Sequence, residues 1–130
     1  MRETTTTTGR LGEAVAADFL RRHGYRIIGT NYRRPYGEID IIARKDSLVF
    51  IEVKAVSCRI PDDIPKEGSD AHRPEENVGT AKRERLRRIT ETYLSSEVDG
   101  DPAWRFDLLC VYLDQARGEA RIKWLDNIII

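Results

Sequence analysis

Glu38-Ile39-Asp40-Ile41-Ile42-Ala43-Arg44, followed after Lys45-Asp46-Ser47 by Leu48-Val49-Phe50-Ile51-Glu52-Val53-Lys54, is the stretch that decides the fold of this chain. Both runs are rich in apolar and β-branched residues, and only a short polar segment separates them, which is the pattern of a β-hairpin. A three-residue loop would pair Arg44 with Leu48. It would also place Asp40 opposite Glu52, and Glu38 opposite Lys54.

This hairpin would bring two carboxylates and a lysine onto one face. Alternation along the strands places Asp40, Glu52 and Lys54 on the same side. Like charges at a cross-strand pair are destabilising, so a cation between Asp40 and Glu52 gives the pattern a physical reason. Oxygen ligands suit Mg²⁺ or Mn²⁺, and such a metal beside a lysine suits phosphodiester hydrolysis. The alternative is a solvated face with a Glu38–Lys54 ion pair.

Composition sets the class of protein but not its function. The chain has 130 residues, 22 basic and 22 acidic, so bulk charge does not indicate a nucleic-acid binder. The two cysteines, Cys58 and Cys110, have no zinc-ligand spacing. We expect a reduced, cytoplasmic protein without a signal peptide or membrane span.

The remaining pattern predicts one domain over residues 8–130, after a disordered tail at 1–7 and with a long mobile loop at about 57–79. Helices are expected from about Thr8 to His23-Gly24 and over 80–96. Further strands are expected over 25–32, 104–113 and 120–125, with a turn at 33–37. The order α-β-β-β-α-β-β predicts an α/β fold with a central mixed sheet flanked by helices.

Motifs spread over most of the chain strengthen this interpretation. They are Gly9-x-x-Gly12-Glu13-x-x-Ala16, Gly24-Tyr25, Asn31-Tyr32, Gly37-Glu38-Ile39-Asp40-x-Ile42, Phe50-x-Glu52-Val53-Lys54, Lys82 with Leu86 and Tyr93-Leu94, and Arg105-Phe106-Asp107. Together they resemble the YraN-like family of small bacterial proteins. That family is similar to the restriction-endonuclease-like, PD-(D/E)xK superfamily, and in particular to Holliday-junction resolvases.

The resemblance implies a metal-dependent nuclease acting on DNA, with branched DNA among its candidate substrates and a homodimer as a candidate assembly. Asp40 and Glu52 match the metal-binding carboxylates and Lys54 the catalytic lysine, while Glu13 matches a first-helix glutamate that joins the site. The chain departs from the family at Val56, where a basic residue is usual.

Four further residues are candidates for nucleic-acid contact. Arg33 and Arg34 stand in the turn before the Asp40 strand, Tyr36 could stack on a base, and Lys82 begins a basic helix face. A plain solvated surface is the alternative for that helix face. Asp107 is assigned a structural role.

Two other functions stay open at this stage. A non-catalytic nucleic-acid-binding or adaptor protein could retain the nuclease fold, which the neutral net charge favours. A protein-interaction module could instead use the 57–79 segment to fold on a partner.

Overall fold

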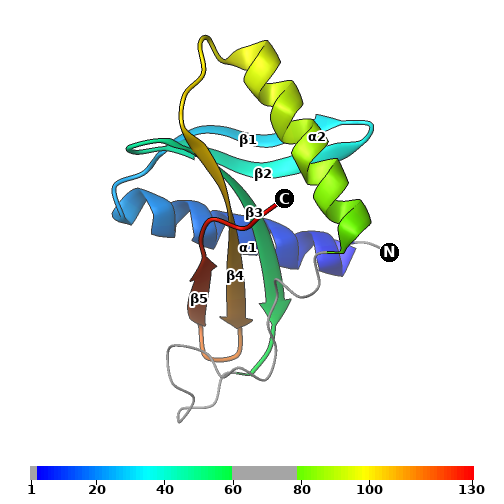
Figure 1. The fold of residues 1–130 in the computed structure, drawn as a ribbon. Coiled ribbons are helices and arrows are strands. Elements are labelled where there is room, and N and C mark those ends of the chain that lie inside the picture. The colour runs from blue at the N-terminus through cyan, green and yellow to red at the C-terminus, as the bar shows by residue number, and fades with distance from the viewer. Residues whose placement is uncertain (1–2, 60–78) are drawn as a thin grey trace.

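The computed structural model describes residues 3–59 and 79–130 (Figure 1). In this part of the chain the elements are α1 (Glu3–Arg22), β1 (Arg26–Arg34), β2 (Gly37–Arg44), β3 (Leu48–Ser57), α2 (Thr80–Glu97), β4 (Trp104–Asp114) and β5 (Glu119–Leu125). Their order is the predicted one.

The strands form one five-stranded mixed sheet in the order β1-β2-β3-β4-β5. Neighbouring strands are antiparallel except for β3 and β4, which run parallel. A parallel pair needs a crossover connection, and α2 lies on that connection. The predicted α/β class and the restriction-endonuclease-like core are therefore confirmed.

Each helix covers its own face of the sheet (Figure 1). The core under α1 contains Ala16, Leu20, Ile41, Ala43, Val49, Ile51, Leu109, Val111 and Leu113. The core under α2 contains Ile39, Ile42, Leu48, Phe50, Leu86, Ile89 and Phe106. Residues 49 and 51 thus face α1, whereas 48 and 50 face α2, which is the period-two pattern of a strand buried on both sides.

The predicted hairpin register is confirmed for its paired part. Arg44 pairs with Leu48, and the ladder continues to Ile41 and Ile51, where it ends. Asp40 and Glu52 lie just beyond this end. The expected Glu38–Lys54 pair is wrong, because Glu38 forms an ion pair with Arg33 on β1, at 3.1 Å.

Several predicted boundaries need correction. α1 begins at Glu3, ahead of the expected start at Thr8, because β-branched threonines lower helix propensity only slightly and do not end a helix. β1 extends to Arg34, so Arg33 and Arg34 are strand residues and not turn residues. Cross-strand pairing with Glu38 and Gly37 accounts for this extension. The predicted loop at 57–79 falls mainly on residues 60–78, outside the described residues, and β3 itself continues to Ser57.

Asp107 has a structural role, as predicted, and the structure shows that it is fully buried. It accepts hydrogen bonds from Arg105 Nε at 3.0 Å, from Trp124 Nε1 at 2.8 Å and from the Asn127 backbone N–H at 2.8 Å. Arg105 also donates to the Tyr25 hydroxyl at 3.0 Å. These donors compensate the buried charge and join β4 to β5 and the segment after it.

No helix in residues 3–59 and 79–130 is both long enough and apolar enough to cross a membrane.

Candidate functional site

Asp40 lies at an irregular point of the sheet. Its neighbours on β2 change sides, because Ile39 and Ile42 both pack under α2 while Ile41 packs under α1. Across from it on β1, Asn31 has a φ of 50°, a left-handed conformation that asparagine tolerates better than most residues. The flanking pairs, Thr30 with Ile41 and Tyr32 with Ile39, keep the register on either side of this point.

The Asp40 carboxylate lies in a partly buried position that disfavours its charged form. Its Oδ2 accepts a hydrogen bond of 2.8 Å from the Val53 backbone N–H, just past the end of the β2–β3 ladder. Burial raises the pKa of Asp40 from 3.8 to about 7. The charges of Glu52, Glu13 and Glu38 raise this pKa further, while the Val53 hydrogen bond opposes the rise. Asp40 is therefore at the centre of a carboxylate cluster drawn from three elements.

Asn31 joins two members of this cluster. Its Nδ2 donates to Glu13 Oε1 at 3.2 Å and to Glu38 Oε2 at 3.0 Å. Asn31 is a functional candidate that the sequence reasoning missed. It belongs to a motif quoted above, and a polar asparagine inside a strand is disfavoured, so its position was a usable signal.

Glu13 reaches the cluster because α1 packs tightly against β3. A Cβ built on the preceding residue, Gly12, would lie 2.4 Å from the Cβ of Ala55. Only glycine permits this close approach of helix to strand. Glu13 is thus close enough to accept a hydrogen bond from Asn31 and for its charge to raise the pKa of Asp40.

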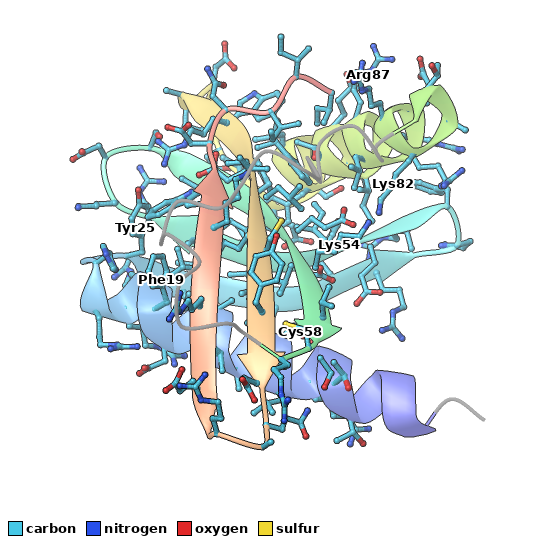
Figure 2. The ribbon with its side chains drawn as sticks, turned by 90° about the horizontal axis from the view of Figure 1, so that it is seen from below. Phe19, Tyr25, Lys54, Cys58, Lys82 and Arg87 are labelled. Atoms are coloured by element: carbon cyan, nitrogen blue, oxygen red, sulfur yellow. The ribbon has the colours of Figure 1, made fainter. Side chains whose placement is uncertain are left out.

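Glu52 is engaged by a residue from α2. Lys82 Nζ lies 2.5 Å from Glu52 Oε2, with the two side chains 34% and 19% exposed. Lys82 was predicted to contact nucleic acid, but in this structure its ammonium group neutralises a candidate metal ligand. Lys54 is half-buried on β3, two residues after Glu52 and hence on the same face (Figure 2).

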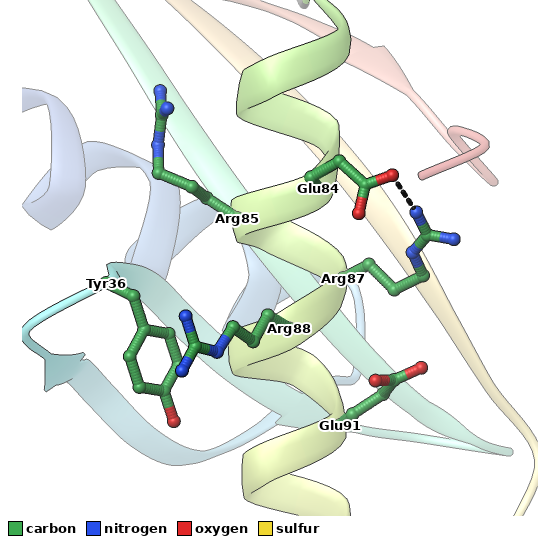
Figure 3. A pocket seen from close by; sticks show the side chains of 6 residues that line it. All are labelled: Tyr36, Glu84, Arg85, Arg87, Arg88 and Glu91. Atoms are coloured by element: carbon green, nitrogen blue, oxygen red, sulfur yellow. Dashed lines mark hydrogen bonds and ion pairs between the residues drawn. The ribbon is translucent and has the colours of Figure 1, made fainter.

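Two hollows adjoin at this end of the molecule. The smaller, about 180 Å³, is lined by Gly37, Glu38, Asp40, Glu52, Lys82, Arg85 and Leu86. The larger, about 510 Å³, is lined by Tyr36, Glu84, Arg85, Arg87, Arg88 and Glu91 (Figure 3). The carboxylate cluster belongs to the smaller hollow, so volume alone does not identify the chemical site. Arg85 lines both hollows and connects them.

The predicted nucleic-acid contacts have local partners here. Arg33 pairs with Glu38, and the Arg34 guanidinium lies 4.4 Å from the centre of the Tyr32 ring. The Arg88 guanidinium lies 3.9 Å from the centre of the Tyr36 ring, and the Tyr36 hydroxyl is 2.6 Å from that of Thr92. One face of Tyr36 is therefore covered, which leaves less of the ring for the base stacking that we expected.

The donors present suit a hard divalent cation, since all are carboxylate or amide oxygens around an excess of negative charge. Their spacing is looser than a metal site requires. Within residues 3–59 and 79–130, no three histidine, cysteine, aspartate or glutamate side chains are grouped closely enough to hold a metal ion. The chemistry of the donors fits Mg²⁺ or Mn²⁺, while Glu52 is paired with Lys82.

Comparison with known proteins gives a family without an assigned activity. The model of "Uncharacterised protein family UPF0102" matches residues 12–111. A UPF0102 protein of Moorella thermoacetica is 39% identical over 124 residues, covering 95% of each chain. Another, from Acetivibrio thermocellus, is 37% identical over 122 residues, covering 92% of this chain and 86% of its own. The matched range includes Glu13, Asp40, Glu52, Lys54 and Lys82. The chain therefore belongs to the uncharacterised family UPF0102, the YraN-like family that its motifs resemble.

Proposed function

We propose that this protein is a metal-dependent endonuclease that hydrolyses phosphodiester bonds in DNA, with branched DNA as one candidate substrate. The observation that supports it most is the environment of Asp40. Its buried carboxyl group has a pKa raised to about 7, partly by the charges of Glu52, Glu13 and Glu38. Strongly perturbed carboxyl groups in a hollow are typical of functional sites, and a divalent cation would relieve this repulsion.

Each residue of the candidate site would have a separate role in this reaction. Asp40 and Glu52 would hold Mg²⁺ or Mn²⁺, with Glu13 completing the ligand set. A bound ion of this kind polarises a phosphate oxygen and lowers the pKa of a water molecule beside it. Lys54, on the same face as Glu52, would orient the attacking water or stabilise the negative charge that develops on the phosphate.

The substrate would approach over the larger hollow. Arg85 lines both hollows and has no ion-pair partner among the described residues, so its charge is available to a phosphate group. Arg33 and Arg34 lie at the end of β1, near the start of the Asp40 strand. Phosphate contacts of this kind fix the position of a nucleic acid without reading its sequence.

The test combines metal binding with cleavage. A calorimetric Mn²⁺ titration of the wild type and of Asp40→Asn needs no choice of substrate, and cleavage is then assayed on junction, flap, duplex and single-stranded DNA and on RNA. We expect saturable Mn²⁺ binding and cleavage in the wild type, and neither in Asp40→Asn. Asp46→Asn, the same chemical change at an exposed position in the turn of the same hairpin, should retain both. Undiminished cleavage by Asp40→Asn would refute the assignment.

A non-catalytic nucleic-acid-binding protein is the second candidate. The Lys82–Glu52 ion pair favours it, because that contact neutralises a carboxylate that a nuclease would use. This alternative predicts DNA binding that persists in EDTA and in Asp40→Asn but weakens when Arg33 and Arg34 are replaced by glutamine.

A further inference from the structure

Among residues 3–59 and 79–130, Lys82 is the cation nearest to the candidate metal ligands. Its ammonium nitrogen lies 2.5 Å from Glu52 Oε2, and both residues line the 180 Å³ hollow that also contains Asp40. Glu52 belongs to β3, whereas Lys82 comes from α2, on a different element. The α2 helix therefore places a positive charge beside a carboxylate of the sheet.

The first turn of α2 does little by itself to stabilise this position. Gly79 is the N-cap residue, and it has no side chain to accept a hydrogen bond from the first turn. The first turn contains no acidic residue, and Lys82 itself places a positive charge near the positive end of the helix dipole. Among the described residues, the ion pair with Glu52 is thus the main contact that holds the Lys82 ammonium group in place.

A metal and Lys82 would meet at the same Glu52 carboxylate. A divalent cation bound by Asp40 and Glu52 would repel the ammonium group that now lies against Glu52 Oε2. Metal binding and the Lys82–Glu52 ion pair therefore compete in this hollow. The ion pair lowers the apparent affinity for the metal, and a bound metal weakens the ion pair.

We propose that Lys82 is the counterion of Glu52 and competes, through its charge, with a divalent metal for this carboxylate. This inference rests on the proposed metal site and adds to it a residue, Lys82, that opposes metal binding. Removing Lys82 should strengthen metal binding, although a lysine at a nuclease site would ordinarily be expected to assist function. The ion pair thereby offsets the charge of Glu52 in the metal-free protein.

The test is a calorimetric Mn²⁺ titration of the full chain, comparing the wild type with Lys82→Met, Lys82→Arg and Arg83→Met. Methionine keeps the length of the side chain and removes its charge. Arginine retains the charge, and Arg83 is an exposed cation in the same turn. Thermal melts of each variant establish that it is folded.

We expect the Kd for Mn²⁺ to fall about fivefold in Lys82→Met, which corresponds to losing a partly exposed ion pair at the upper end of its usual range. Lys82→Arg and Arg83→Met should bind Mn²⁺ as the wild type does. Binding by Lys82→Met alone, with none by the wild type, would also support competition.

Two results would overturn the inference, and they are distinguishable. If the wild type binds Mn²⁺ and Lys82→Met binds it equally or more weakly, Lys82 is not a competitor, and the proposed nuclease function is unaffected. If no variant binds Mn²⁺, including Lys82→Met, both the competition and the metal site proposed under the nuclease function are refuted.

Discussion

Asp40→Asn should make the metal-free protein more stable at neutral pH, even though it removes a residue of the candidate site. In the folded protein the pKa of Asp40 is about 7, against an ordinary value of 3.8, because burial and the charges of Glu52, Glu13 and Glu38 disfavour the carboxylate. Asparagine cannot ionise, and its Oδ1 can accept the Val53 N–H hydrogen bond that Asp40 Oδ2 accepts now, at 2.8 Å.

The sign of the effect follows from proton linkage. A carboxyl group with a raised folded-state pKa keeps its proton in the folded state where the unfolded chain has lost it. The wild type therefore loses stability as the pH rises from about 4 to about 7, and little more above that. Each pKa unit corresponds to about 1.4 kcal/mol, so the interval from 3.8 to about 7 corresponds to about 4 kcal/mol as an upper value.

The measurement is urea unfolding in EDTA at several pH values between 4 and 8, for the wild type, Asp40→Asn and Asp46→Asn. At pH 7.5 we expect Asp40→Asn to exceed the wild type by about 2–4 kcal/mol in free energy of unfolding. Near pH 4 the difference should nearly vanish. Asp46→Asn, exposed in the hairpin turn, should follow the wild type at every pH. An Asp40→Asn variant that is no more stable than the wild type at pH 7.5 would refute the reasoning.

Three further substitutions test the packing, the substrate surface and the buried network. Gly12→Ala should cost about 1–3 kcal/mol of stability in thermal melts, because its Cβ would lie 2.4 Å from that of Ala55, whereas Gly9→Ala, with no atom within 4 Å, should be neutral or slightly stabilising. Arg85→Gln should lower the slope of log affinity for DNA against log salt by about 0.7–0.9, measured by fluorescence anisotropy in EDTA. Arg87→Gln, on the same hollow but paired with Glu84, should leave that slope unchanged, and equal slopes for both variants would contradict the role of Arg85. Asp107→Asn should cost about 3 kcal/mol in urea unfolding, because it places an amide group among donors from Arg105, Trp124 and Asn127; a loss below about 1 kcal/mol would argue against the network.

The sheet could be predicted because its signals are local. A short loop fixes the pairing of Arg44 with Leu48, and period-two alternation then determines which side chains share a face. The crossover helix between β3 and β4 follows from the order of elements. The hairpin connects residues near one another in the sequence, and the crossover follows from element order, so both can be inferred without the structure.

The details of the site depend instead on contacts between distant segments. The helical pattern predicted a helix over 80–96, but the position of the Lys82 ammonium group depends on how α2 crosses the sheet. The left-handed conformation of Asn31 likewise comes from the β1–β2 pairing and from its hydrogen bonds to Glu13 and Glu38. Periodicity predicts the face of an element, whereas the end of a long polar side chain is placed by its partners.

The distribution of partners among the four carboxylates indicates where a cation would be most favourable. Glu13 and Glu38 receive hydrogen bonds from Asn31, Glu38 also pairs with Arg33, and Glu52 pairs with Lys82. Among the described residues, Asp40 receives only the Val53 backbone N–H. Burial disfavours the charge of Asp40, and this charge has the weakest compensation of the four, since a neutral amide offsets less than a cation does. In the proposed metal site, a divalent ion would relieve the least compensated charge at Asp40 and would compete with Lys82 at Glu52. We therefore expect Asp40 to affect both the affinity of the proposed site and the stability of the metal-free fold, and Lys82 to affect that affinity.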